Sequence, residues 1–282
     1  MANSYLNIVI FLLATLTYYL IKPQLTYQIS TDPKGYKEYI STNYMYLAIY
    51  LLLVMVSQFL INASIISSTC GGNITENMGA AGVFTFLPWT LIFGVIIIIL
   101  TIYPGFKSAF SDVIGYFYVS GQANKVLTTL LIDRDIQKKI DTDTELTPEK
   151  KESMQNAADA IIKICGNTSI LINQIVPSNF NDYWKILTPL MKDKYQHEGP
   201  ETDDIRNDLF DLVVTRDNVG ESLWYIYTGL LLTSIVQLKM TTRGCVNNPK
   251  TMEQNYEKFL ETQQKAQSAQ ETATSTTYTM TG

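Results

Sequence analysis

Four long stretches of the chain contain no Asp, Glu, Lys or Arg, and this segregation of charge constrains the fold more than any other feature. The stretches are residues 6–21, 44–66, 83–103 and 223–238. Charged residues make up only 17% of the 282, below the quarter that is usual in soluble domains. An apolar helix of about 20 residues spans the hydrocarbon core of a bilayer. The sequence therefore predicts a mainly α membrane protein with about four transmembrane helices.

The first and fourth stretches are shorter than the other two, and short apolar runs also occur in the buried helices of soluble proteins. Whether residues 6–21 and 223–238 span fully is therefore open at this stage. The N-terminal run has no basic residue before it and no small-residue cleavage site after it. We interpret it as an uncleaved anchor rather than a signal peptide.

These stretches divide the chain into a three-span membrane region (1–103), an extramembrane domain (104–222), a fourth span (223–238) and a tail (239–282). The domain is expected to be mainly helical. The tail is expected to be disordered from about residue 262, because it has almost no large aliphatic side chains to bury.

Within the domain, Pro104 and Gly105 predict a helix stop. An apolar stripe follows at helical spacing and predicts an amphipathic helix that lies on the membrane or packs on the domain. The stripe consists of Phe110, Val113, Ile114, Phe117 and Gly121. Further helices are predicted from Thr147 to about Cys165, over Phe180–Met191 with a break near Pro189, and from Thr202 to about Val214. The run Ser169–Val176 is compatible with a short strand.

Charge near the predicted spans gives a weak orientation. Lysines and arginines are slightly more numerous on the side of 104–222, which the positive-inside rule places in the cytosol, with both termini and 67–82 opposite. Glu221 precedes the fourth span and is predicted to be an interfacial anchor at the positive end of the helix dipole. The alternative is that Glu221 pairs with Arg216 or Lys107 and holds the domain on the membrane.

The sequence contains no recognisable set of catalytic residues. The single histidine, His197, lies in a polar run, and the sequence has no phosphate-binding, dinucleotide-binding or nucleophile-elbow motif. The acidic positions Asp203, Asp204, Asp208 and Asp211 are most simply a solvated helix face. We expect no enzyme activity, no cofactor and no metal. The net charge of −5 also argues against a nucleic-acid partner.

Polar but uncharged residues occur inside the predicted spans. Gln58 and Asn62 are four residues apart in the second span, and Thr233 and Gln237 are four apart in the fourth. Pumps and proton relays usually need ionisable groups within the membrane, and none of these residues is ionisable. Interhelical hydrogen bonding is therefore the simpler interpretation, with a transport path as the alternative.

Three cysteines suggest one cross-link. Cys70 and Cys245 follow the second and fourth spans and lie on the same membrane side, because two spans separate them. Glycines flank both, so the backbone can adjust to disulfide geometry. We predict a Cys70–Cys245 disulfide with Cys165 as a free buried thiol; the alternative is three free thiols. Asn73 begins a weak glycosylation sequon in the loop that carries Cys70.

Two stretches resemble one family. Residues 103–116 (YPGFKSAFSDVIGY) are similar to the pattern P-G-x-x-x-P-F-S-N-T-F-G-Y, and 219–229 (VGESLWYIYTG) to V-A-E-x-[VI]-W-Y-x-L-T-G. The matching positions are Pro104, Gly105, Phe110, Ser111, Gly115, Tyr116, Glu221, Trp224 and Gly229. Ala109 and Asp112 depart from the pattern, which has Pro and Asn there. The family is that of the transmembrane minor capsid proteins in the internal membrane of nucleocytoplasmic large DNA viruses, including chlorovirus-like icosahedral giant viruses.

This resemblance implies a non-enzymatic structural protein that links the inner lipid membrane of a virion to its icosahedral capsid shell. Its implied partners are the lipid bilayer, other minor capsid proteins and the major capsid protein, and self-association is left open. Its implied location is the virion inner membrane, and the host endomembrane during assembly. A viral entry or fusion component, or a small channel or transporter, remains the alternative.

Overall fold

The computed structural model describes residues 5–70, 74–131, 167–242 and 249–275. Within these ranges the chain is helical and contains no strand; the nearest approach to one is an isolated antiparallel bridge between Leu131 and Met191. The mainly α class expected from the sequence is therefore correct for the described residues. The helices are α1 (Tyr5–Ile21), α2 (Tyr27–Thr31), α3 (Pro33–Cys70), α4 (Ile74–Pro88), η1 (Trp89–Gly94), α5 (Val95–Ile102), η2 (Pro104–Lys107), α6 (Ser108–Phe110), η3 (Ser111–Gly115), α7 (Tyr116–Leu130), α10 (Thr168–Gln174), α11 (Phe180–Leu187), η4 (Thr188–Leu190), η5 (Asp193–Tyr195), α12 (Pro200–Thr242) and α13 (Pro249–Ser275).

Three helical runs are long and apolar enough to cross a membrane. They are α3, the run Asn77–Ile102 through α4, η1 and α5, and α12. They contain the second and fourth predicted spans and all of the third except Tyr103. The first predicted span is α1, an apolar helix of 17 residues that is shorter than these three. A fourth span therefore remains a prediction.

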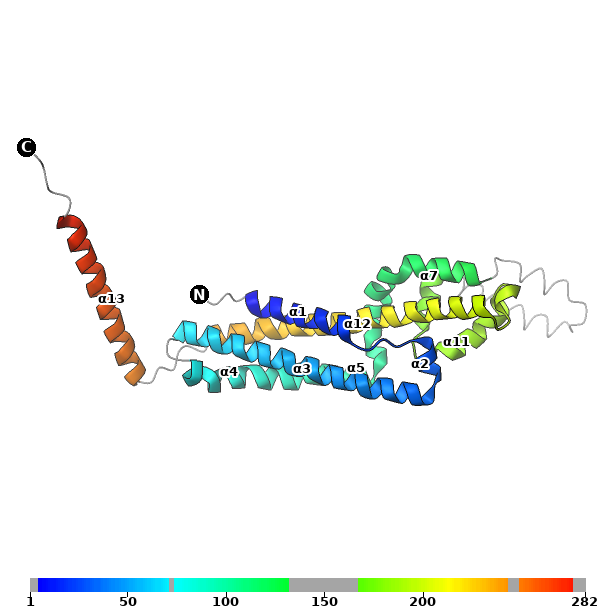
Figure 1. Ribbon diagram of the computed structural model, residues 1–282, viewed down its shortest axis with the longest axis horizontal. Coiled ribbons are helices and arrows are strands. Elements are labelled where there is room, and N and C mark those ends of the chain that lie inside the picture. The colour runs from blue at the N-terminus through cyan, green and yellow to red at the C-terminus, as the bar shows by residue number, and fades with distance from the viewer. Residues whose placement is uncertain (1–4, 71–73, 132–166, 243–248, 276–282) are drawn as a thin grey trace, which may run out of the picture. The chain divides into compact units, whose positions relative to one another are not determined.

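The helix α12 corrects one expectation. The predicted helix from Thr202 and the predicted span 223–238 form one continuous helix of 43 residues (Figure 1). Pro200 occupies its first position, and Glu201 and Asp203 lie in its first turn, where a missing N–H and negative charge both favour helix initiation. No proline follows within the helix, so nothing stops it at the boundary at residue 222.

Two other local expectations also change. Residues 168–174, which include most of the possible strand Ser169–Val176, form α10, because the Asn167 side chain caps the helix by accepting from the backbone N–H of Ile170. The tail expected to be disordered from about residue 262 is helical as far as Ser275. Its Ala, Gln, Glu and Lys residues have high helix propensity, which outweighs their inability to form a core. The expected break near Pro189 is present, since α11 gives way to a 3₁₀ turn at Thr188.

The structure divides into two compact units. Unit 1 comprises residues 1–11, 54–90 and 231–282, and unit 2 comprises 12–53 and 91–230. The helices α1, α3 and α12 each contribute residues to both units, and the domain boundaries predicted from the sequence remain a prediction.

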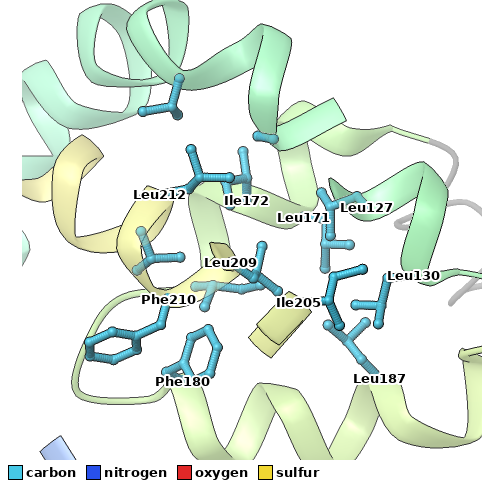
Figure 2. Close-up of a cluster of buried hydrophobic side chains, with 14 of the residues drawn as sticks. Leu127, Leu130, Leu171, Ile172, Phe180, Leu187, Ile205, Leu209, Phe210 and Leu212 are labelled. Atoms are coloured by element: carbon cyan, nitrogen blue, oxygen red, sulfur yellow. The ribbon is translucent and has the colours of Figure 1, made fainter. Parts of the chain in front are cut away.

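Unit 2 contains the larger hydrophobic core. Side chains from α7, α10, α11 and the N-terminal half of α12 converge there, with Phe180 and Phe210 packed edge to face at 5.0 Å between ring centroids (Figure 2). Tyr27 of α2 packs against both rings at 5.7 Å. The segment after α1 is thus part of this core.

The segment after α5 buries a different face from the apolar stripe, so of the two predicted alternatives, packing on the domain is excluded and lying on the membrane remains a prediction. The buried positions recur every four residues at Ser111, Gly115, Val119 and Ala123. The predicted apolar stripe at Val113, Ile114 and Phe117 is exposed instead. The π-helical stretch η3 widens the turn here, which rotates the following residues relative to an ideal α-helix.

Candidate functional site: a buried ion cluster beside the apolar part of α12

Glu221 is the centre of a buried cluster of charges in unit 2. Its Oε2 lies 2.6 Å from Nζ of Lys107, and its Oε1 lies 3.5 Å from Nζ of Lys22. Tyr19 donates a hydrogen bond from its hydroxyl to Oε1 at 3.0 Å. The Glu221 side chain is only 12% exposed. Both oxygens of a nearly buried carboxylate are therefore paired, which buried charge requires.

Two further residues of α12 complete the cluster. Asp217 Oδ2 lies 2.9 Å from Nζ of Lys107, and Asn218 Oδ1 accepts a hydrogen bond from Nζ of Lys22 at 2.7 Å. Asp217 and Glu221 are four residues apart, so the helix presents both carboxylates on one face. The lysines come from elsewhere: Lys22 follows α1 and Lys107 ends η2. The cluster thus fastens three distant parts of the chain together.

The charges in the cluster balance. Burial lowers the pKa of Lys107, but the neighbouring carboxylates of Glu221 and Asp217 outweigh burial and raise that pKa above its ordinary value. Burial lowers the pKa of Lys22, and the attraction of Glu221 offsets this only in part. Lys107 therefore remains protonated and supplies the main compensation for the two carboxylates.

Two glycines allow the segment 107–115 to lie against α12. A Cβ atom on Gly220 would lie 2.7 Å from Cβ of Ser111 and 3.0 Å from the carbonyl oxygen of Lys107. A Cβ atom on Gly115 would lie 2.6 Å from the carbonyl oxygen of Arg216. Only glycine fits at such contacts, so these residues set the distance across which Lys107 reaches Glu221.

Aromatic contacts hold the same two segments together. The indole N–H of Trp224 donates to the carbonyl oxygen of Phe106 at 2.9 Å. The ring of Phe110 packs edge-on against Trp224 at 5.1 Å and lies 6.2 Å from Tyr227. The stretches 103–116 and 219–229, which the sequence singled out separately, therefore contact each other directly. The sequence indicated this contact only through the alternative in which Glu221 pairs with Lys107, and the aromatic contacts were not predicted.

The position of Glu221 decides between the two sequence-based alternatives. Glu221 lies in the interior of α12 rather than at a helix start, so the interpretation as an N-terminal dipole anchor is wrong. It pairs with Lys107, one of the two alternative partners, whereas Arg216 is directed elsewhere. Lys22 was not predicted; its position directly after an apolar stretch was the available signal.

Arg216 is fully buried and has a separate role. Its guanidinium donates to the carbonyl oxygen of Ile172 and, at 2.9 Å, to that of Ile175, at the C-terminal end of α10. Free carbonyls at a helix C-terminus carry partial negative charge and favour a cation. Arg216 therefore caps α10 and fixes it to α12.

The polar residues of the second predicted span lie in a second buried cluster, in unit 1. Asn7 Nδ2 donates to Asn62 Oδ1, and Asn62 Nδ2 donates to Thr85 Oγ1, both at 2.9 Å. Gln58 Nε2 donates to the carbonyl oxygen of Asn7 at 2.9 Å. The network joins α1, α3 and α4 through uncharged groups. In α12, Thr233 is buried and Gln237 is half-buried.

The cysteine prediction is only partly covered by the described residues. Cys70 is disulfide-bonded. Its predicted partner Cys245 lies outside the described residues, as do Cys165 and the sequon residue Asn73. The Cys70–Cys245 pairing therefore remains a prediction.

The other candidates from the sequence do not assemble into a reaction centre within the described ranges. No group of three or more His, Cys, Asp or Glu side chains in those ranges could hold a metal ion. His197 lines a surface pocket with Tyr27, Trp184 and Arg206. Arg206 is paired with Asp203 and stacks over the Tyr27 ring at 4.6 Å.

Comparison with known proteins adds no relative to this picture: no family model, no curated protein and no solved structure matches the chain. The ion cluster, the contacts around Trp224 and the helix α12 are therefore the basis for assigning a function.

Proposed function

We propose that this protein is a structural membrane protein that couples an extramembrane helical domain to a bilayer and, in a virion, links the inner membrane to the capsid shell. The observation that carries this proposal is the fastening of unit 2's core to the apolar part of α12. The helix runs unbroken from that core into residues 223–238, and the cluster around Glu221 ties Lys22 and Lys107 to it at the junction.

This arrangement suits a linker because a linker must transmit force without letting the domain swing. A helix joined to its domain by one flexible connection would not do so. Here three segments meet at Glu221, and loss of the charged side chain from any one of them would leave buried charge without full compensation. The viral part of the proposal is supported by the family resemblance, whose positions Phe110, Ser111 and Glu221 lie within this contact region.

Fractionation of purified particles tests the proposal. After the outer capsid is loosened stepwise, the protein is expected to remain with both shell and membrane until the shell is lost. Particles carrying Lys107→Met are expected to release the membrane from the shell earlier, whereas particles carrying Lys185→Met, on an exposed ion pair with Asp182, are expected to behave as the parent.

Two results would contradict this proposal. One is identical release from Lys107→Met and parental particles, with equal incorporation of the protein. The other is selective ion flux through liposomes that contain the purified protein, which would favour a channel.

A further inference from the structure

Seven large apolar residues between residues 102 and 118 of unit 2 are exposed, and neither the core nor the ion cluster uses their side chains. We call them the interfacial face; it consists of Ile102, Tyr103, Phe106, Val113, Ile114, Phe117 and Tyr118. Phe117 is 79% exposed, Tyr118 71% and Val113 66%. A soluble domain rarely leaves so many large apolar side chains together in water.

We propose that the interfacial face lies in the lipid bilayer, at the boundary between headgroups and acyl chains, on the side where residues 102–118 leave α5. This inference rests on the membrane location in the proposed function. Lipid is the expected occupant because the face is continuous with a candidate span: Ile102 is the last residue of the apolar run Asn77–Ile102. The chain cannot leave the bilayer abruptly while six further apolar side chains remain exposed after Ile102.

The composition along the segment changes as this proposal requires. From residue 102 to 118 the exposed side chains are mostly large and apolar. After Tyr118 the exposed positions of α7 become polar, including Gln122, Asn124, Lys125 and Thr128. The buried face stays small or apolar throughout, at Ser111, Val119 and Leu127. Because the buried side does not change, the change from apolar to polar residues on the exposed side reflects the surroundings of the helix and not its packing against the core.

The neighbouring aromatic residues are of the type found at membrane interfaces. Trp224 and Tyr227 on α12 contact Phe110, at the beginning of the apolar part of that helix. Tryptophan and tyrosine are enriched at the headgroup level of bilayers. Trp224 also donates to the carbonyl oxygen of Phe106, a member of the interfacial face, so the face adjoins the start of the apolar part of α12.

Charge determines which lipids the face should prefer. The segment 102–118 contains one lysine and one acid, Lys107 and Asp112. The Lys107 ammonium pairs with Asp217 and Glu221, so it cannot serve an anionic headgroup. Binding should therefore depend on apolar area, as for interfacial helices that enter lipid by about 5–10 Å, and should not require anionic lipid.

Fluorescence quenching in vesicles tests this inference on the full-length protein. A dansylalanine residue is placed singly at Phe117 or Val113, and the protein is reconstituted into phosphatidylcholine vesicles that carry a nitroxide near the headgroup end of the acyl chain. Matched control positions are Gln122, on the exposed face of the same helix, and Ile186, an exposed apolar residue of α11. Ile98, exposed on α5, reports whether the protein has inserted.

We expect quenching at Phe117 and Val113 to exceed that at Gln122 and Ile186 by roughly twofold or more, as burial at the headgroup boundary requires. Adding phosphatidylserine should leave the difference unchanged. Equal quenching at Phe117 and Gln122, together with strong quenching at Ile98, would overturn this inference while leaving the membrane function intact. Absence of quenching at Ile98 would overturn the membrane location and the inference with it.

Discussion

The two buried polar clusters both hold helices together, but they do so through different interactions. In unit 1, Asn7, Asn62 and Thr85 hold three helices together through neutral hydrogen bonds. In unit 2, Lys107, Asp217 and Glu221 do so through full charges. The members of the neutral cluster lie within the apolar stretches, towards their ends, whereas the charged residues lie just outside such stretches. A charged side chain costs much more free energy inside the bilayer core than at its edge. The position of a cluster relative to the apolar stretches therefore determines whether its members are neutral or charged.

The clusters should also differ in what happens when one member is lost. Removing a neutral partner leaves an unsatisfied amide or hydroxyl, which costs about 1–3 kcal/mol at a buried site in water-soluble proteins. Removing one charge leaves others unpaired, which costs about 3–5 kcal/mol. Four substitutions test this difference, in order of decreasing expected effect.

The largest effect is expected from Lys107→Met. It removes the cation that both Asp217 and Glu221 contact, so the unfolding free energy of the detergent-solubilised full chain should fall by about 3–5 kcal/mol. Adding Asp217→Asn to the same chain should recover part of the loss, because one anion then remains with Lys22. Lys194→Met, at an exposed ion pair with Glu201, is the control and should leave the melting temperature unchanged. A parental melting temperature for Lys107→Met would show that the cluster contributes nothing.

Placing a charge in the neutral cluster should have the next largest effect. Asn62→Asp puts a carboxylate at a fully buried site between Asn7 and Thr85. On the scale for membrane insertion this costs about 2.5–3.5 kcal/mol. The matched control is Asn181→Asp, at an exposed position on α11. Unfolding measurements in detergent compare the two, and equal tolerance would remove the proposed difference in environment between the clusters.

A smaller effect is expected when the charged cluster is kept but its geometry is disturbed. Gly220→Ala adds a methyl group 2.7 Å from Cβ of Ser111, so the segment that carries Lys107 must move away from α12. Overpacking of this kind costs about 1–3 kcal/mol. Gly121→Ala, at a helical position with no neighbour within 4 Å, should instead stabilise the chain slightly, because alanine favours helix. Thermal unfolding of both variants checks the opposite signs.

The smallest effect is expected from Asn62→Leu. It deletes the two hydrogen bonds that Asn62 makes without introducing charge. Interhelical hydrogen bonds in membranes contribute about 1 kcal/mol, and the apolar replacement restores some packing. Leu60→Val, at an exposed apolar position of the same helix, serves as the control. A loss from Asn62→Leu as large as that from Lys107→Met would mean that charge does not distinguish the clusters.

The sequence by itself determined the helical class and the apolar parts of the three long helices. Both follow from local composition: a run without charge that is long enough to span has few other stable structures. It also identified Gln58, Asn62 and Glu221, because polar residues in or beside apolar runs are costly and conspicuous. The residues that complete each cluster were less visible. Asn7 and Lys22 lie at the ends of a short stretch, and Thr85 is an ordinary residue for a span.

Only the tertiary structure decided which residues pair with one another in these clusters. The choice of Lys107 over Arg216 for Glu221 depends on Gly115 and Gly220, which allow residues 107–115 to approach α12 closely. Arg216 lies only five residues before Glu221, yet it turns to the carbonyls of α10 because those carbonyls are buried and need donors. The sequence left open whether the apolar stripe at Val113, Ile114 and Phe117 faces the domain or the membrane, and the structure shows that it does not pack on the core. The π-helical turn η3 changes which of the following residues face the core. A sequence pattern based on the ideal α-helical repeat does not include this change.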